Sequence, residues 1–175
     1  MPESEPTAHT RQERQQEKQQ ETQEEKQKET QQTLPSIYSK EQYPNPLQVL
    51  GESVTVFDAH DSAKPFEVHL QEGQPNGGPP PHHHPWDEAF YVLEGEVSVT
   101  IDGRECRLGA GGFAHIPGGT VHSYSNLSSP TRLLAVVSGC RGGEVFQQMD
   151  QQVKQLPRDL EALTRINEQF GVVFV

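Results

Sequence analysis

Apolar and polar residues alternate in short runs over residues 51–137. In one run Val97, Val99 and Ile101 fall on one face and the polar residues between them on the other, which is the period of a half-buried β-strand. Gly, Pro, Asn and Asp separate the runs at close intervals, as is typical between strands. The pattern predicts strands at Ser53–Asp58, Phe66–Gln71, Ala89–Leu93, Val97–Asp102, Glu105–Leu108, Gly112–Ile116, His122–Ser125 and Thr131–Val137.

Tight turns connect several of these strands. Asp102-Gly103 has the composition of a type I′ hairpin turn, and Glu94-Gly95 forms a second turn in the same series. Short strands joined by short turns favour a closed barrel or jelly roll, because closure removes unpaired sheet edges. The predicted fold class is therefore all-β.

After Gly143 the pattern changes to a helical one. We predict helices over Glu144–Gln155 and Arg158–Phe170, the second with apolar residues at helical spacing and bracketed by Pro157 and Gly171. We expect both helices to pack against the barrel rather than to form a lid. The apolar end of the chain, Val172–Val175, is either a returning strand or a packed tail.

The first 33 residues have a different composition from the rest. They contain no Leu, Ile, Val or aromatic residue, and they are rich in Gln, Glu, Lys, Arg and Thr. Such a segment cannot bury apolar surface to offset the entropy lost on ordering. We therefore expect a disordered Gln/Glu-rich tail over 1–33 and a single globular domain over 34–175.

Charge excludes several classes of partner. The net charge is −11, with −3 on the first 33 residues (eight acids, five bases) and −8 on the rest (seventeen acids, nine bases). Neither part has the basic stripe that nucleic acids or anionic membranes require, so we expect no nucleic-acid and no membrane partner.

An expectation for the cellular location follows from two kinds of segment that are not found in the sequence. There is neither a run of about 20 apolar residues nor an apolar core behind a basic start, so we expect no transmembrane helix, no secretory signal and a cytoplasmic location. Cys106 and Cys140 are too few for a disulfide framework. We expect reduced thiols that are buried or inert, and a disulfide between the two cysteines is an alternative that the sequence does not decide.

The densest group of metal-binding side chains lies in residues 81–88. In an extended segment His82 and His84 project to the same side and His83 to the other, and Glu88 follows just before an apolar strand. A Pro-Gly-Gly turn leads into a second strand that begins near His122. Three imidazoles and one carboxylate suit a single divalent ion of Fe, Mn, Ni, Co, Cu or Zn. Four protein ligands leave two octahedral positions open for substrate or O₂, unlike a structural zinc site.

These two segments resemble the two signature motifs of the cupin superfamily. His82-x-His84-x3-Glu88-x6-Gly95 matches the first motif, although Gly77 stands one residue closer to His82 than its leading glycine should. Gly111-x5-Pro117-x-Gly119-x2-His122-x3-Asn126 matches the second at every specified position. The resemblance implies a double-stranded β-helix (jelly-roll) barrel with His82, His84, Glu88 and His122 as metal ligands. It also favours a homodimer.

Other residues near the motifs can be assigned roles as hypotheses. Phe90, Phe113, Tyr124 and His115 are candidate pocket residues, although core packing explains the three aromatic residues as well, and His115 can instead contact a carboxylate or face solvent. We expect His83 to face outward. For Trp86 and Asp87 we expect turn and packing roles.

Three functions remain open. Parts of the chain look similar to single-cupin quercetin 2,3-dioxygenase-like proteins, which implies a dioxygenase acting on a flavonol-like or other aromatic molecule, with Glu88 as both ligand and general base. An isomerase or decarboxylase of sugars or small acids is a second possibility, but its anionic substrates need Arg or Lys clamps that the predicted strands supply sparingly. The third is a non-catalytic, metal-dependent binder of a small molecule.

Overall fold

The computed structural model describes residues 36–57, 65–139 and 141–175. The expected tail, Asp58 at the end of one predicted strand, and Cys140 lie outside these residues. Contacts divide the chain into two units, Met1–Ile37 and Tyr38–Val175. The second unit contains every strand and helix described below.

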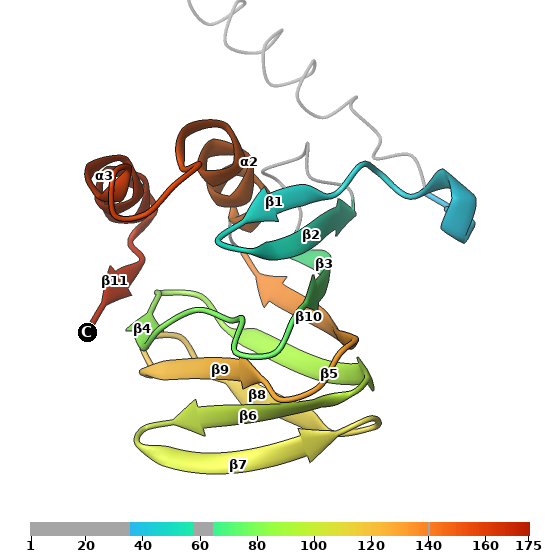
Figure 1. The fold of residues 1–175 in the computed structure, drawn as a ribbon. Coiled ribbons are helices and arrows are strands. Elements are labelled where there is room, and N and C mark those ends of the chain that lie inside the picture. The colour runs from blue at the N-terminus through green and yellow to red at the C-terminus, as the bar shows by residue number, and fades with distance from the viewer. Residues whose placement is uncertain (1–35, 58–64, 140) are drawn as a thin grey trace, which may run out of the picture. The chain divides into compact units, whose positions relative to one another are not determined.

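Two antiparallel sheets form the barrel within the described residues (Figure 1). One has the strand order β1-β2-β3-β10-β5-β8 and the other β11-β4-β9-β6-β7. The strand bounds are β1 Leu47–Val49, β2 Glu52–Phe57, β3 Phe66–Gly73, β4 His82–His83, β5 Glu88–Glu94, β6 Glu96–Ile101, β7 Arg104–Gly109, β8 Phe113–Ile116, β9 His122–Asn126, β10 Thr131–Ser138 and β11 Val173–Phe174. The predicted all-β jelly roll is confirmed, and each of the predicted strands is present with ends within one or two residues.

The turns follow the local sequence. Asp102 and Gly103 both have positive φ, 48° and 76°, as a type I′ turn requires, and they join β6 to β7. Two strands were not predicted, β1 and β4, and for the end of the chain the structure selects the returning strand, β11, over the packed tail. At two or three residues they are too short to show an alternating pattern, and only pairing with distant segments defines them.

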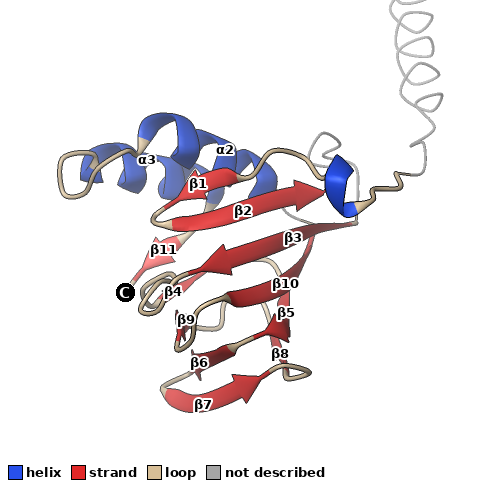
Figure 2. Ribbon diagram, turned by 45° about the vertical axis from the view of Figure 1, so that its right-hand side comes forward, coloured by secondary structure: helices blue, strands red, loops and turns tan. Residues whose placement is uncertain are grey.

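Three helical segments accompany the barrel: a 3₁₀ turn η1 (Lys40–Gln42) and the helices α2 (Gly142–Gln152) and α3 (Leu160–Phe170). α2 lies beside β1, the edge strand of the larger sheet, and packs against α3 (Figure 2). Both were predicted, but α2 ends three residues early and α3 begins two residues late. The Asp159 carboxylate explains this, because it accepts the N–H groups of Lys154 and Gln155 and so stabilises a loop between the helices.

Apolar side chains form two separate clusters. One fills the barrel between the sheets and consists of Phe90, Val92, Val97, Val99, Ile116, Tyr124, Leu133 and Ala135. The other joins β1 and β2 to the two helices and consists of Val49, Val54, Val56, Val145, Met149, Val153, Leu163 and Ile166. A cavity lies between them, because residues of both clusters line it. The helices therefore pack against the barrel, as expected, and they also form one wall of the cavity.

Candidate metal centre

Three histidines meet at the barrel end of this cavity. His82 of β4 pairs directly with His122 of β9, and His84 follows β4 immediately. One ring nitrogen from each of the three can be chosen so that all lie within 4.8 Å of one another, and all three residues are buried. Because His82 and His84 are two residues apart in an extended segment, they point to the same side, as predicted, and His83 points away and is half-buried.

Backbone carbonyls fix the orientation of all three rings. Nδ1 of His82 lies 2.9 Å from the Pro80 oxygen, Nδ1 of His84 lies 2.9 Å from the Trp86 oxygen, and Nδ1 of His122 lies 2.9 Å from the Thr120 oxygen. A carbonyl can only accept, so each Nδ1 carries the proton and donates it. Each neutral ring then presents the unprotonated Nε2 lone pair that a metal ion needs.

The Glu88 carboxylate completes the group. Its Oε2 lies 3.0 Å from Nε2 of His84 and 3.4 Å from Nε2 of His122, at the start of β5. With Nδ1 protonated, these Nε2 atoms and the carboxylate are all acceptors, so only a shared proton or a cation can make their close approach favourable. The donor set therefore fits a divalent transition metal, which prefers imidazole and carboxylate ligands.

The electrostatics favour the metal-binding forms of two of these groups. Burial, followed by the nearby His122, lowers the pKa of His82 to about 4, so this imidazole is neutral near pH 7. Burial alone would raise the pKa of Glu88, but the close contacts with the His122 and His84 rings outweigh it and lower the pKa to about 2. Burial acts to lower the pKa of His122, but the Glu88 carboxylate prevails and raises it. The raised pKa of His122 reflects the negative charge of the Glu88 carboxylate, which a bound cation would balance.

Trp86 and Asp87 lie between the ligands His84 and Glu88. The expected roles in turn formation and packing are more specific in the structure, because both residues contact parts of the site. The Trp86 ring stacks on His84, with centroids 4.4 Å apart and planes 9° from parallel. The Asp87 carboxylate accepts the N–H of Gly118, and the His84 carbonyl accepts that of Gly119. The two motif segments are thereby joined directly beside the ligands.

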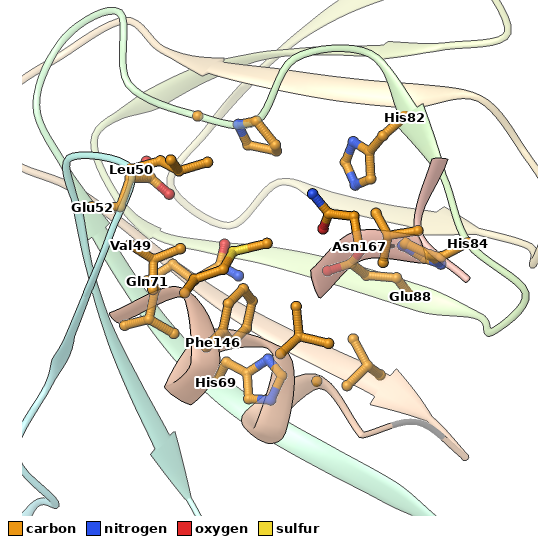
Figure 3. Close-up of a pocket in the computed structure, with 18 of the residues that line it drawn as sticks. Val49, Leu50, Glu52, His69, Gln71, His82, His84, Glu88, Phe146 and Asn167 are labelled. Carbon is orange, nitrogen blue, oxygen red and sulfur yellow. Dashed lines mark hydrogen bonds and ion pairs between the residues drawn. The ribbon is translucent and has the colours of Figure 1, made fainter. Parts of the chain in front are cut away.

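The cavity extends from the histidines toward the helices and has a volume of about 120 Å³ (Figure 3). Its walls are mainly apolar, with side chains from β1, β2, β5, α2 and the C-terminal segment. Phe90 and Tyr124 line it, as the pocket hypothesis expected. Val172 and Phe174 also line it, because β11 pairs with β4 and brings Phe174 opposite His82.

The structure places the other two expected pocket residues elsewhere. Phe113 lies opposite Tyr91 and His115 opposite Ala89 in the β5–β8 ladder, where opposing residues share a face. That face is the outer one: Phe113 is 61% exposed and His115 is also exposed. Sequence alternation could not decide which face of β8 points inward.

Cys106 is a free, exposed thiol on β7, so of the two expected states, buried or inert, it is not buried, and its inertness stays a prediction. No helix of the described residues is long and apolar enough to cross a membrane.

Four polar residues that line the cavity were not predicted from the sequence: Glu52, His69, Gln71 and Asn167. The buried pair Glu52 and Gln71 contacts the Tyr124 hydroxyl, and Asn126 donates to Glu52 over 2.7 Å. Burial and the Glu52 carboxylate raise the pKa of Tyr124 well above its ordinary value, so the phenol remains protonated. His69 of β3 and Asn167 of α3 also line the cavity. Alternation in β3 and the amphipathic pattern of α3 show that these residues face inward, but not that they face a cavity.

Comparison with known proteins agrees with this site. A model of the cupin domain family matches residues 69–137. Over 57 residues the chain is 42% identical to quercetin 2,3-dioxygenase of Bacillus subtilis (strain 168), a match that covers 32% of this chain. The chain spans only 17% of that protein's length.

Two solved structures are similar. The structure of KdgF from Halomonas sp. superimposes with a TM-score of 0.57 at 19% identity, covering 63% of this chain and 99% of that one, which supports the fold alone. The polyketide cyclase RemF from Streptomyces resistomycificus gives a TM-score of 0.51 at 27% identity, covering 60% of this chain and 79% of that one.

Proposed function

Since this chain belongs to the cupin superfamily, we propose that it is a metal-dependent dioxygenase acting on a small aromatic molecule with a hydroxyl group. His82, His84, Glu88 and His122 hold one divalent transition-metal ion in this proposal. A quercetin 2,3-dioxygenase and a polyketide cyclase among the similar proteins support this choice.

One observation carries the proposal: three imidazoles and a carboxylate converge, and His82, His84 and Glu88 of this group line a cavity whose remaining walls are mainly apolar. The bound ion supplies Lewis acidity toward a substrate hydroxyl and a place for substrate and O₂ to meet. The apolar walls exclude water from the activated substrate and bind its ring.

Glu88 is the proposed general base. Its carboxylate is ionised near pH 7 and lies beside the Nε2 atoms of two ligand histidines, within reach of a hydroxyl placed between them. It accepts the hydroxyl proton as the substrate binds.

Charge and size restrict the substrate. No Lys or Arg is among the described residues that line the cavity, and Arg132 is engaged at the surface with Glu72 and Glu94. A sugar phosphate or a small acid would lack its counter-charge, which disfavours the isomerase and decarboxylase alternatives. A cavity of about 150 Å³ accommodates one benzene-sized molecule, so the volume of about 120 Å³ favours a single ring over a three-ring flavonol.

The test uses protein purified without an affinity tag and reconstituted in turn with each candidate metal. Elemental analysis should find close to one metal ion per chain, and His82→Ala or His122→Ala should lower metal affinity by more than about 100-fold. The metal-loaded protein is then incubated with single-ring phenols and with flavonols, with and without O₂, and the absorbance of the substrate is recorded. O₂-dependent loss supports the dioxygenase. Tight binding without loss would identify a metal-dependent binder instead, and failure to retain any metal would refute the metal centre.

A homodimer and a cytoplasmic location remain predictions. The molar mass of the purified chain, measured by light scattering, tests the first, and cell fractionation tests the second.

A further inference from the structure

Two buried polar side chains in the cavity wall have atoms without partners among the described residues. Asn167 is 2% exposed, and neither its Nδ2 nor its Oδ1 has a hydrogen-bond partner. His69 is 1% exposed, and its Nδ1 has none. Both residues line the same cavity as His82, His84 and Glu88. A buried polar atom without a partner destabilises the fold, so we expect an occupant of the cavity that pairs with both of these side chains.

Asn167 occupies a position where the fold has no need of a polar residue. It lies on the inward face of α3 beside Leu163 and Ile166, which pack in the apolar cluster against β1, β2 and α2. Its backbone oxygen accepts the N–H of Val172, but its side-chain amide makes no such bond. In Figure 3 this amide points into the cavity on the side where His82 and Glu88 lie.

His69 is held in one orientation by its neighbours. Nε2 lies 3.2 Å from Oε2 of Glu67, and the same oxygen accepts the N–H of Gly143 at the start of α2 over 2.9 Å. Since Oε2 can only accept, Nε2 carries the proton and Nδ1 presents a lone pair. His69 lies against Phe146 with ring centroids 5.1 Å apart (Figure 3). The lone pair is thus an acceptor in a part of the cavity formed by β3 and α2.

We propose that Asn167 and His69 form a two-point recognition subsite for a neutral hydroxy-carbonyl ring compound. The inference rests on the proposed function for the reacting hydroxyl, which lies at the metal ligands. Nδ2 of Asn167 donates to the carbonyl oxygen next to that hydroxyl. Nδ1 of His69 accepts a hydrogen bond from a second hydroxyl at the other end of the ring. The absence of Lys and Arg among the described lining residues fits a neutral ligand.

Two single-ring probes separate the contacts. Kojic acid carries a ring hydroxyl next to a carbonyl and a hydroxymethyl group across the ring, and allomaltol has a methyl group in place of the hydroxymethyl. Binding of each is measured by NMR titration of the full-length protein, with and without bound Zn²⁺. The wild type should bind kojic acid about tenfold more tightly than allomaltol, because only kojic acid satisfies His69.

The variants assign each contact. Asn167→Leu should weaken both probes about tenfold, with an unchanged or higher melting temperature, because it removes a buried amide without partners. His69→Phe should weaken kojic acid alone and so remove the preference between the probes. Ile166→Leu, in the same helix but outside the cavity lining, is the control and should leave the affinities for both probes unchanged.

The results also separate this subsite from the metal centre. The effect of Asn167→Leu should persist in the metal-free protein, so it can be found even if the dioxygenase proposal fails. A folded Asn167→Leu variant that binds both probes like the wild type overturns the proposal. Absence of saturable binding to the wild type overturns it as well. If the variants behave as expected but Zn²⁺ does not strengthen binding of the probes, the metal part of the proposed function fails and the subsite stands.

Discussion

The Asp87 carboxylate accepts a hydrogen bond from the backbone N–H of Gly118 over 2.8 Å. This bond connects the segment that carries His84 and Glu88 to the turn that precedes His122. The backbone of Asp87 is itself anchored, because its oxygen accepts the N–H of Ser138 at the end of β10. The Asp87 side chain thus helps to hold three ligands from two distant parts of the chain, although it contacts none of their side chains.

Replacing Asp87 should therefore affect metal binding from outside the ligand set. We expect Asp87→Ala to lower the free energy of unfolding by about 1 kcal/mol and to weaken Zn²⁺ binding about tenfold. Urea unfolding and Zn²⁺ titration measure the two effects. Asp87→Asn keeps an acceptor oxygen and serves as the control. Equal metal affinities of the Ala and Asn variants would contradict the positioning role.

Glu88→Gln separates coordination from proton transfer. The amide is nearly isosteric but carries no charge and cannot take up a proton, so we expect weakened yet measurable metal binding and a turnover about 10²- to 10⁴-fold slower. Metal content and O₂ uptake should be measured on the same preparation. Glu94→Gln, at the exposed end of the same strand, is the matched control. Full turnover by the Glu88 variant would refute Glu88 as base.

Gly171 redirects the chain from α3 into β11. It adopts φ +75° at the end of the helix, a conformation that costs about 1 kcal/mol for a residue with a side chain. Gly171→Ala should therefore destabilise the fold by about that amount and loosen β11, which lies against His82. Hydrogen exchange at Val173 and Phe174 measures the loosening of β11, and the affinity for kojic acid measures its effect on the cavity.

Gly103→Ala is the control for this change. Gly103 has nearly the same φ, +76°, in the turn between β6 and β7, and it does not line the cavity. The two variants should lose similar stability, but only Gly171→Ala should weaken ligand binding. Equal binding by both would mean that β11 does not matter for the site.

Acid should weaken the loop between the helices through Asp159. The Arg158 guanidinium, followed by the N–H groups of Gln155 and Lys154, holds the pKa of this carboxyl well below its ordinary value of 3.8. A lowered folded-state pKa means that the stabilisation is fully present above the unfolded value and is lost as the pH falls through the folded one. Urea unfolding at pH 6, 4, 3 and 2 should show the wild type losing its advantage over Asp159→Asn only below about pH 4. A constant difference down to pH 2 would contradict this.

Much of the site was predictable because its signals are local. Spacing by two in an extended segment placed His82 and His84 on one side, and the Pro-Gly-Gly turn before β9 positioned His122. Alternation within a strand likewise identified the strands of the barrel. Each of these features depends on residues a few positions apart, for which strand geometry is the same in every protein.

The tertiary structure decided the features that depend on contacts between distant segments. Phe113 faces solvent because of its register with Tyr91, and Asn167 faces the cavity because α3 packs its apolar face against β1, β2 and α2. His69 obtains its orientation from Glu67 and the first turn of α2, more than seventy residues later. The sequence by itself determined the barrel and the four candidate ligands. Which polar groups surround them was decided by long-range packing, because alternation tells which residues share a face but not what that face meets.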